Sequence, residues 1–254
     1  MKLKMLSAAA LCVVLAACGG GGDGGNDGSN PPADHGPKLE GFYEGTVTGG
    51  VATAFDFIAL EDGTFYALAF DANGSIVSYE QGTGTSSDGH FSSSNARDFI
   101  NAPTTNAAIA ATFVAGTSFN GTLTGPDGTV TLAAAAVPAS EFDYNKPAAL
   151  ADVAGNWTMA LDDGEYASVT VSNVGAVSSI SSGGCQATGT AKPRASGKNI
   201  FDVSMTSGGA PCAYPGQTTT GIALSGTSDD GTRGLIVMTV NSARTVGGLA
   251  VGVR

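Results

Sequence analysis

The chain is poor in basic residues and in histidine, and these shortages exclude several functions. Its 254 residues contain 11 Lys and Arg against 22 Asp and Glu, for a net charge of −11. A protein that binds nucleic acid needs a basic face, which this composition does not provide. With two histidines, His35 and His90, and four cysteines, the usual metal ligands are also scarce. We expect no nucleic-acid partner, no metal site and no cofactor.

Recognisable catalytic motifs are missing as well. The sequence has no Gly-x-Ser-x-Gly elbow, no phosphate-binding Gly-x-x-x-x-Gly-Lys-Ser/Thr loop and no dinucleotide fingerprint. Acidic groups do occur, at Glu61/Asp62, Asp162/Asp163 with Glu165, and Asp229/Asp230. Acids directly before a glycine are typical of turns. We therefore predict that the chain is not an enzyme. The alternative is a hydrolase that acts on envelope polymers through acidic loop residues.

The first 17 residues have the three parts of an export signal. Lys2 and Lys4 precede an apolar run from Leu6 to Leu15, and small residues then lead to Cys18. The run is too short to span a bilayer, which takes about 20 apolar residues. No second run approaches that length, so we expect no membrane-spanning segment, and a lipid attached to the chain would be its only anchor.

Leu15-Ala16-Ala17-Cys18 resembles the lipobox of bacterial lipoproteins. The resemblance implies cleavage between Ala17 and Cys18. It also implies a diacylglyceryl thioether on Cys18, usually with a further acyl chain such as palmitate on its amino group. Several acyl chains hold a protein on a membrane far better than one. Gly19 stands where Asp retains lipoproteins in the inner membrane, so the resemblance implies the outer membrane, on its periplasmic face or at the cell surface. The alternative is an ordinary secretory signal.

Residues 18–38 form a tether in this interpretation. They are rich in glycine and have almost nothing to bury, so we predict a disordered spacer. Removal of residues 1–17 takes away two lysines and no acid. The mature chain then has 9 basic and 22 acidic residues and a net charge near −13.

The four cysteines divide by position. Cys12 leaves with the signal and Cys18 carries the lipid, which leaves Cys185 and Cys212. An even pair in an oxidising compartment predicts a disulfide, and the alternative, a metal pair, lacks histidine partners. In the chain-entropy model such a bridge contributes roughly 3–4 kcal/mol.

From Leu39 onward, short runs alternate apolar and polar residues, and turn residues separate them every 8 to 12 positions. This pattern is typical of an all-β sandwich or barrel. The predicted strands are 41–48, 53–60, 64–70, 75–84, 90–95, 107–115, 117–124 and 129–136, and then 155–161, 165–172, 175–182, 184–190, 198–206, 217–226, 233–241 and 246–253.

The strands fall into two halves that resemble each other. Gly41-Phe42-Tyr43 matches Gly155-Asn156-Trp157, and the spacing from Phe57 to Gly63 recurs from Val169 to Gly175. We predict an all-β protein with two tandem, antiparallel, up-and-down β-barrel-like domains of about eight strands each. The first is residues 39–137 and the second 154–254, with a linker at 138–153. Such a barrel is either filled by side chains or holds one small ligand.

This architecture resembles the lipid-anchored surface proteins that bind transferrin or complement factor H, although no binding residue carries over. We predict an outer-membrane lipoprotein that acts as a non-enzymatic binding or envelope scaffold protein. A carrier of a small apolar ligand inside a barrel is an alternative. Lys192, Arg194 and Lys198 form the densest basic spot and could contact an acidic partner, or belong to a solvated loop. Trp157 either lines a pocket or fills the closed end of a barrel.

Overall fold

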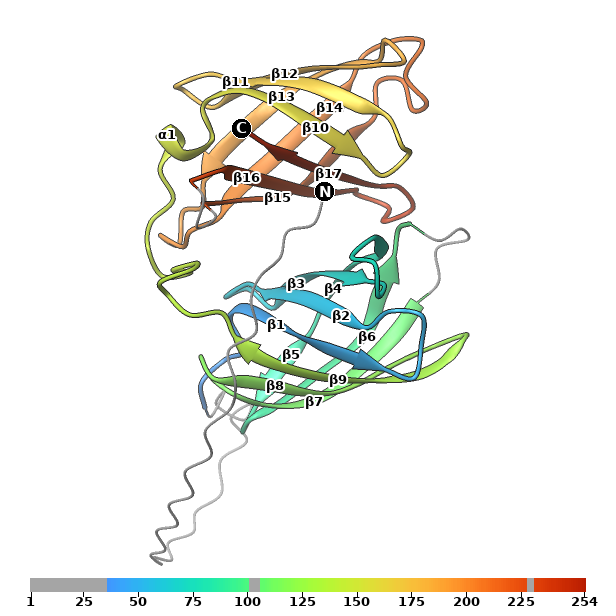
Figure 1. Ribbon diagram of the computed structural model, residues 1–254, viewed down its shortest axis with the longest axis vertical. Helices are drawn as coiled ribbons and strands as arrows, with labels where there is room; N and C mark the ends of the chain where they lie inside the picture. The colour runs from blue at the N-terminus through green and yellow to red at the C-terminus, as the bar shows by residue number, and fades with distance from the viewer. Residues whose placement is uncertain (1–35, 101–105, 228–230) are drawn as a thin grey trace, which may run out of the picture.

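A computed structural model describes residues 36–100, 106–227 and 231–254. They form two antiparallel β-barrels that lie one above the other with their walls in contact (Figure 1). Residues 137–154 join the barrels and contain a short helix, α1 (Leu150–Val153). The prediction of an all-β protein with two barrels is confirmed.

The first barrel contains β1 to β9. The strands are β1 (Gly41–Thr48), β2 (Ala54–Ala59), β3 (Thr64–Phe70), β4 (Ile76–Thr83), β5 (Thr85–Ser87), β6 (His90–Asp98), β7 (Asn106–Val114), β8 (Ser118–Gly125) and β9 (Gly128–Ala136). Neighbours along the chain pair with each other except β4 and β5, which both pair with β6, and β1 pairs with β9. β4 and β5 pair with successive parts of β6, so together they occupy one strand position. The barrel wall therefore has eight strand positions.

Gly84 separates β4 from β5, and the sequence pattern does not predict this break. A Cβ atom at Gly84 would lie 2.2 Å from the ring of Phe91, so no other residue fits there. The strand predicted at 75–84 therefore ends one residue early, and the short strand β5 was not predicted.

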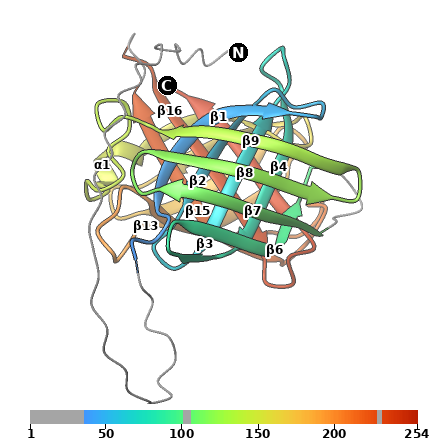
Figure 2. The same cartoon turned by 90° about the horizontal axis from the view of Figure 1, so that it is seen from below.

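The second barrel contains β10 to β17 and closes through pairing of β10 with β17. The strands are β10 (Gly155–Leu161), β11 (Tyr166–Val171), β12 (Ala176–Ser181), β13 (Gln186–Pro193), β14 (Phe201–Ser207), β15 (Thr218–Thr227), β16 (Arg233–Asn241) and β17 (Gly247–Val253). Figure 2 shows the wall of β7 to β9 in front, with strands of the second barrel behind it.

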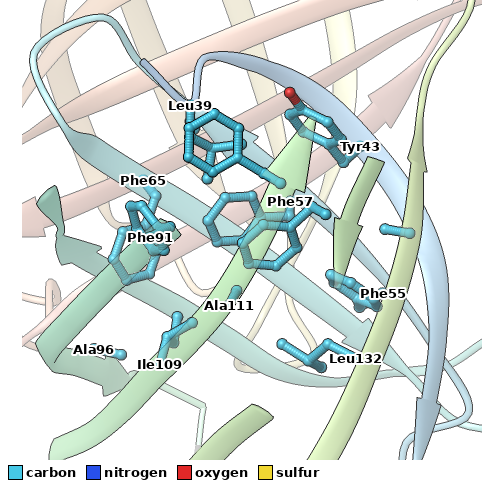
Figure 3. Close-up of a cluster of buried hydrophobic side chains, with 14 of the residues drawn as sticks. Leu39, Tyr43, Phe55, Phe57, Phe65, Phe91, Ala96, Ile109, Ala111 and Leu132 are labelled. Atoms are coloured by element: carbon cyan, nitrogen blue, oxygen red, sulfur yellow. The ribbon is translucent and has the colours of Figure 1, made fainter. Parts of the chain in front are cut away.

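Alternation along the strands places every second side chain inside a barrel. In β2, Phe55 and Phe57 point into the first barrel (Figure 3). Phe57 stacks on Phe65 and Phe119 with ring centroids 5.2 and 4.6 Å apart. Tyr43 pairs with Phe57 across β1 and β2, and Trp157 pairs with Val169 across β10 and β11. The two pairs occupy equivalent places, as the internal sequence match predicts.

The outward faces of several strands are apolar as well, and they pack the barrels against each other. The first barrel contributes Ile58, Leu60, Tyr66, Leu68 and Tyr79. The second contributes Ile200, Ile222, Leu224, Met238, Val240 and Leu249, and the linker adds Phe142 and Tyr144. We call these residues the inter-barrel seam. The seam explains why residues 235–240 are apolar on both faces, since the other half of the chain covers the outer one.

Polar contacts cross the same interface at fixed points. The Tyr79 hydroxyl donates to the backbone oxygen of Thr239 at 3.1 Å. Arg244 donates to Gln81 Oε1 at 2.7 Å and to the backbone oxygens of Gln81 and Asn95. Arg97 in turn donates to the backbone oxygen of Arg244. These directional contacts set one relative orientation of the two barrels.

Candidate functional site

The second barrel encloses a cavity of about 270 Å³. Its wall consists of inward-facing side chains that are small or medium in size. They include Met159, Leu161, Ala167, Val169, Val171, Val177, Ala187, Ala191, Val203, Met205, Ala223, Leu235, Val237 and Ala250. Since few of these are large, the eight-stranded wall leaves space at its centre.

The first barrel differs because aromatic rings fill its interior. Its core contains six phenylalanines, Phe55, Phe57, Phe65, Phe91, Phe113 and Phe119. In the described core of the second barrel the aromatic residues are Trp157 and Phe201. The interior of an eight-stranded barrel can be filled by side chains or left hollow, and here the first barrel is filled and the second is hollow.

Trp157 closes one end of the second barrel. Its side chain is 2% exposed, and its Nε1 donates to the backbone oxygen of Val153, the last residue of α1, at 2.7 Å. The Arg254 guanidinium lies over the indole ring, 4.2 Å from the centroid. Trp157 therefore fills the closed end of the barrel.

The other end of the cavity is polar and reaches solvent. Ser179, Ser181, Ser207 and Thr239 line it there, together with Cys185. The serines and Cys185 are partly exposed, whereas Val153 and Leu235 at the closed end are buried. The Cys185–Cys212 disulfide joins the β12–β13 turn to the β14–β15 loop beside this opening, as the sequence predicts.

Asp162 is the one charged side chain among the described residues that line the cavity. Burial raises its pKa, the Leu249 N–H hydrogen bond opposes that shift, and the neighbouring Asp163 adds to it. No lysine or arginine is present in this lining. The cavity therefore suits a molecule without negative charge.

A second hollow of about 400 Å³ lies between the barrels, and we call it the groove. The β2–β3 turn and the outer face of β13 to β15 form it. Hydroxyl and charged groups predominate in its lining, with Thr64, Tyr66, Thr190, Ser204 and Thr220 beside Asp62, Lys192, Arg194 and Asp202. The groove thus presents both polar groups and apolar surface, the latter from residues such as Leu60 and Ile222.

The three basic residues singled out in the sequence lie beside this groove or at the seam. Arg194 bonds to Glu61 at 2.8 Å and to Asp62 at 2.6 Å, both in the first barrel, and to Asp202 at 2.7 Å. Lys198 pairs with Glu40 at 3.1 Å and lies 4.9 Å from the Tyr144 ring centroid. The acidic groups that Arg194 and Lys198 contact here thus belong to the same chain. Lys192 is exposed in the groove, and an external acidic partner stays a prediction.

The acidic turns do not share one cleft. Burial alone would raise the pKa values of Glu61 and Asp62. Hydrogen bonds from backbone N–H groups and from Arg194 outweigh burial and hold both pKa values below their ordinary range. Asp162, Asp163 and Glu165 lie in the β10–β11 turn of the other barrel. Asp229 and Asp230 fall outside the described residues.

Two other carboxylates have a pKa of about 7, Asp56 in β2 and Glu80 in β4. Burial is the main cause for both. The facing strand adds a like charge in each case, Glu44 beside Asp56 and Asp98 beside Glu80. Neither Asp56 nor Glu80 lines the cavity or the groove.

The predicted cleavage and acylation positions, Ala17 and Cys18, lie outside the described residues. Within residues 36–100, 106–227 and 231–254, no helix is long and apolar enough to cross a membrane. The same residues contain no group of three His, Cys, Asp or Glu side chains that could hold a metal ion.

No protein-family model matches this chain, and neither does a curated protein. Solved structures that match this chain with low TM-scores include two proteins. One is a protein of unknown function from the DUF3598 family of Nostoc punctiforme, with 14% identity, coverage of 84% of this chain and 94% of that one, and a TM-score of 0.24. The other is a mutant of the vaccine antigen Transferrin Binding Protein B from Haemophilus parasuis, with 8% identity, coverage of 87% and 77%, and a TM-score of 0.26. At these TM-scores neither likeness carries an argument about function.

The disulfide is expected to stabilise the open end of the second barrel. Replacing both cysteines, Cys185→Ser with Cys212→Ser, should lower the free energy of unfolding by roughly 3–4 kcal/mol, because the unfolded chain loses a cross-link. Urea denaturation followed by Trp157 fluorescence measures this change. Cys12→Ser is the matched control and should have no effect, since we predict that residue to leave with the signal. Equal stability of the double variant and the wild type would contradict the expectation.

The raised pKa values of Asp56 and Glu80 predict a dependence of stability on pH. Folded, both carboxyls hold a proton up to about pH 7, whereas the ordinary values are 3.8 and 4.5. The folded state therefore binds more protons over that window, and the free energy of unfolding falls as the pH rises through it. Asp56→Asn with Glu80→Gln should flatten this slope in urea denaturation between pH 5 and 8. An unchanged slope in the double variant would show that other groups cause it.

Proposed function

We propose that this chain is a lipid-anchored, non-enzymatic binding or scaffold protein of the outer membrane. The observation that carries the proposal is the inter-barrel seam, which joins two barrels into one unit with a polar groove of fixed shape. A preformed surface of this kind reduces the entropic cost of binding a partner. The Leu15-Ala16-Ala17-Cys18 sequence and the glycine-rich stretch after it support attachment through an acyl group and a spacer.

A second candidate function is favoured by the cavity of the second barrel. It has apolar walls, a closed end at Trp157 and an opening at the disulfide. Concave, mostly apolar sites with a few polar groups are typical of small-molecule binding. A carrier of a small apolar ligand can also be a lipid-anchored binding protein, so the two candidates are compatible.

Metabolic labelling with a radioactive fatty acid tests the anchor. The wild-type chain should be labelled and Cys18→Ser should not, because the thioether forms on that sulfur. Cys12→Ser is the matched control and should keep the label, since that cysteine lies inside the predicted signal. Protease treatment of intact cells then distinguishes the cell surface from the periplasmic face. An unlabelled wild type, or label retained in Cys18→Ser, would refute the lipoprotein proposal.

A further inference from the structure

The inward side chains of three strands change from apolar to hydroxyl-bearing at the same end of the second barrel. Along β12 the inward residues run from Val177 to Ser179 and Ser181. Along β14 they end at Ser207, and along β16 the last residue that lines the cavity is Thr239. The cavity therefore has an apolar body and one polar end, which is the pattern of an amphiphile.

Two of the hydroxyls are available to a ligand. Ser181 bonds to the Glu165 carboxylate, and the Thr239 hydroxyl donates to the backbone oxygen of Gly248 at 3.4 Å. Among the described residues, no group forms a hydrogen bond with the hydroxyl of Ser179 or Ser207. Their partner is water or a bound head group, because polar groups at a partly buried site seldom stay unpaired.

The volume of the cavity limits the size of a ligand. An apolar cavity of roughly 150 Å³ takes one benzene ring. In proportion, the cavity of about 270 Å³ takes about eleven non-hydrogen atoms. Since Trp157 closes the far end, an alkyl chain can enter only from the opening beside the disulfide.

The charged residues in the cavity lining determine which head group a ligand can have. A carboxylate or phosphate loses its hydration on entry and needs a cation to offset that loss. The described lining contains no lysine or arginine, and its one charged residue, Asp162, is acidic. An anionic amphiphile such as a fatty acid is therefore disfavoured, whereas a hydroxyl or other neutral hydrogen-bonding group fits the serines.

We propose that the second barrel binds one small amphiphile, with its alkyl chain against the apolar wall and an uncharged head group hydrogen-bonded to Ser179 and Ser207. This inference rests on the carrier function proposed above and adds the class of ligand to it. It places the ligand inside the barrel and leaves the groove to other partners.

Isothermal titration calorimetry with 1-decanol and with decanoate at pH 8 tests the proposal. The mature chain, exported with a secretory signal and carrying Cys18→Ser, needs no detergent that would compete with the probe. We expect 1-decanol to bind with a stoichiometry of one, and decanoate to bind at least ~10-fold more weakly because its charge has no partner.

Matched variants locate the binding. Ala250→Phe fills the cavity and should abolish 1-decanol binding, whereas Ala160→Phe, on the outward face of β10, should not. Ser207→Ala should weaken binding about fivefold, the equivalent of one neutral hydrogen bond. Ser204→Ala, which faces the groove, should leave it unchanged. Since Ser207→Ala is a small change, it tests the site even where Ala250→Phe disturbs the fold.

Each contrary outcome has a distinct meaning. Equal affinities for 1-decanol and decanoate would overturn the inference about the head group and leave a carrier function standing. No binding of either probe would overturn both. Weaker binding in Ser204→Ala with no change in Ser207→Ala would move the ligand to the groove and refute the proposed site.

Discussion

Closure of each sheet on itself is the constraint on which the rest of this structure depends. A closed wall has no free edges, so every residue of a strand points either into the barrel or away from it. The size of the inward residues then decides whether the interior is solid or hollow. Six phenylalanines make the first barrel solid, while alanine, valine and serine leave about 270 Å³ inside the second. The same architecture thus has a filled and a hollow interior within one chain.

The outward-facing residues of the strands determine how the two barrels pack against each other. Residues of β3 such as Tyr66 and Leu68 are buried under the other barrel, and Met238 of β16 meets them from the opposite side. Burial of this apolar seam is non-directional, so the orientation depends on polar contacts. Arg244 and Arg194 supply these contacts by reaching acceptors on the first barrel. The groove exists because this arrangement is fixed.

Much of the fold could be predicted from the sequence, because strand alternation and turn glycines are local signals. The bounds of β1, β3, β10 and β16 agree with prediction to the residue. Gly63 and Gly128, each directly after an aspartate, have φ values of +83° and +123°, which glycine adopts readily. The disulfide followed from counting cysteines and assigning a compartment.

Other features depend on distant contacts and could not be predicted. The break at Gly84 reflects the Phe91 ring on another strand. Two of the three carboxylates that bind Arg194, those of Glu61 and Asp62, lie more than 130 positions away, so the sequence indicated only a basic spot. From the sequence, a hollow barrel was only one of two possible interiors. Alternation identifies the inward residues of a strand but does not show whether their volumes fill the barrel. Phe142 and Tyr144 were assigned to a linker, yet they complete the seam.

The central claim is that one barrel is solid and the other hollow. Crystals of the protein exposed to xenon under pressure test it most directly, because xenon enters empty apolar cavities without needing a head group. The account predicts xenon density inside the second barrel, between Met159 and Met205, and none among the phenylalanines of the first. Absence of xenon from the second barrel, or equal occupancy of both interiors, would contradict it.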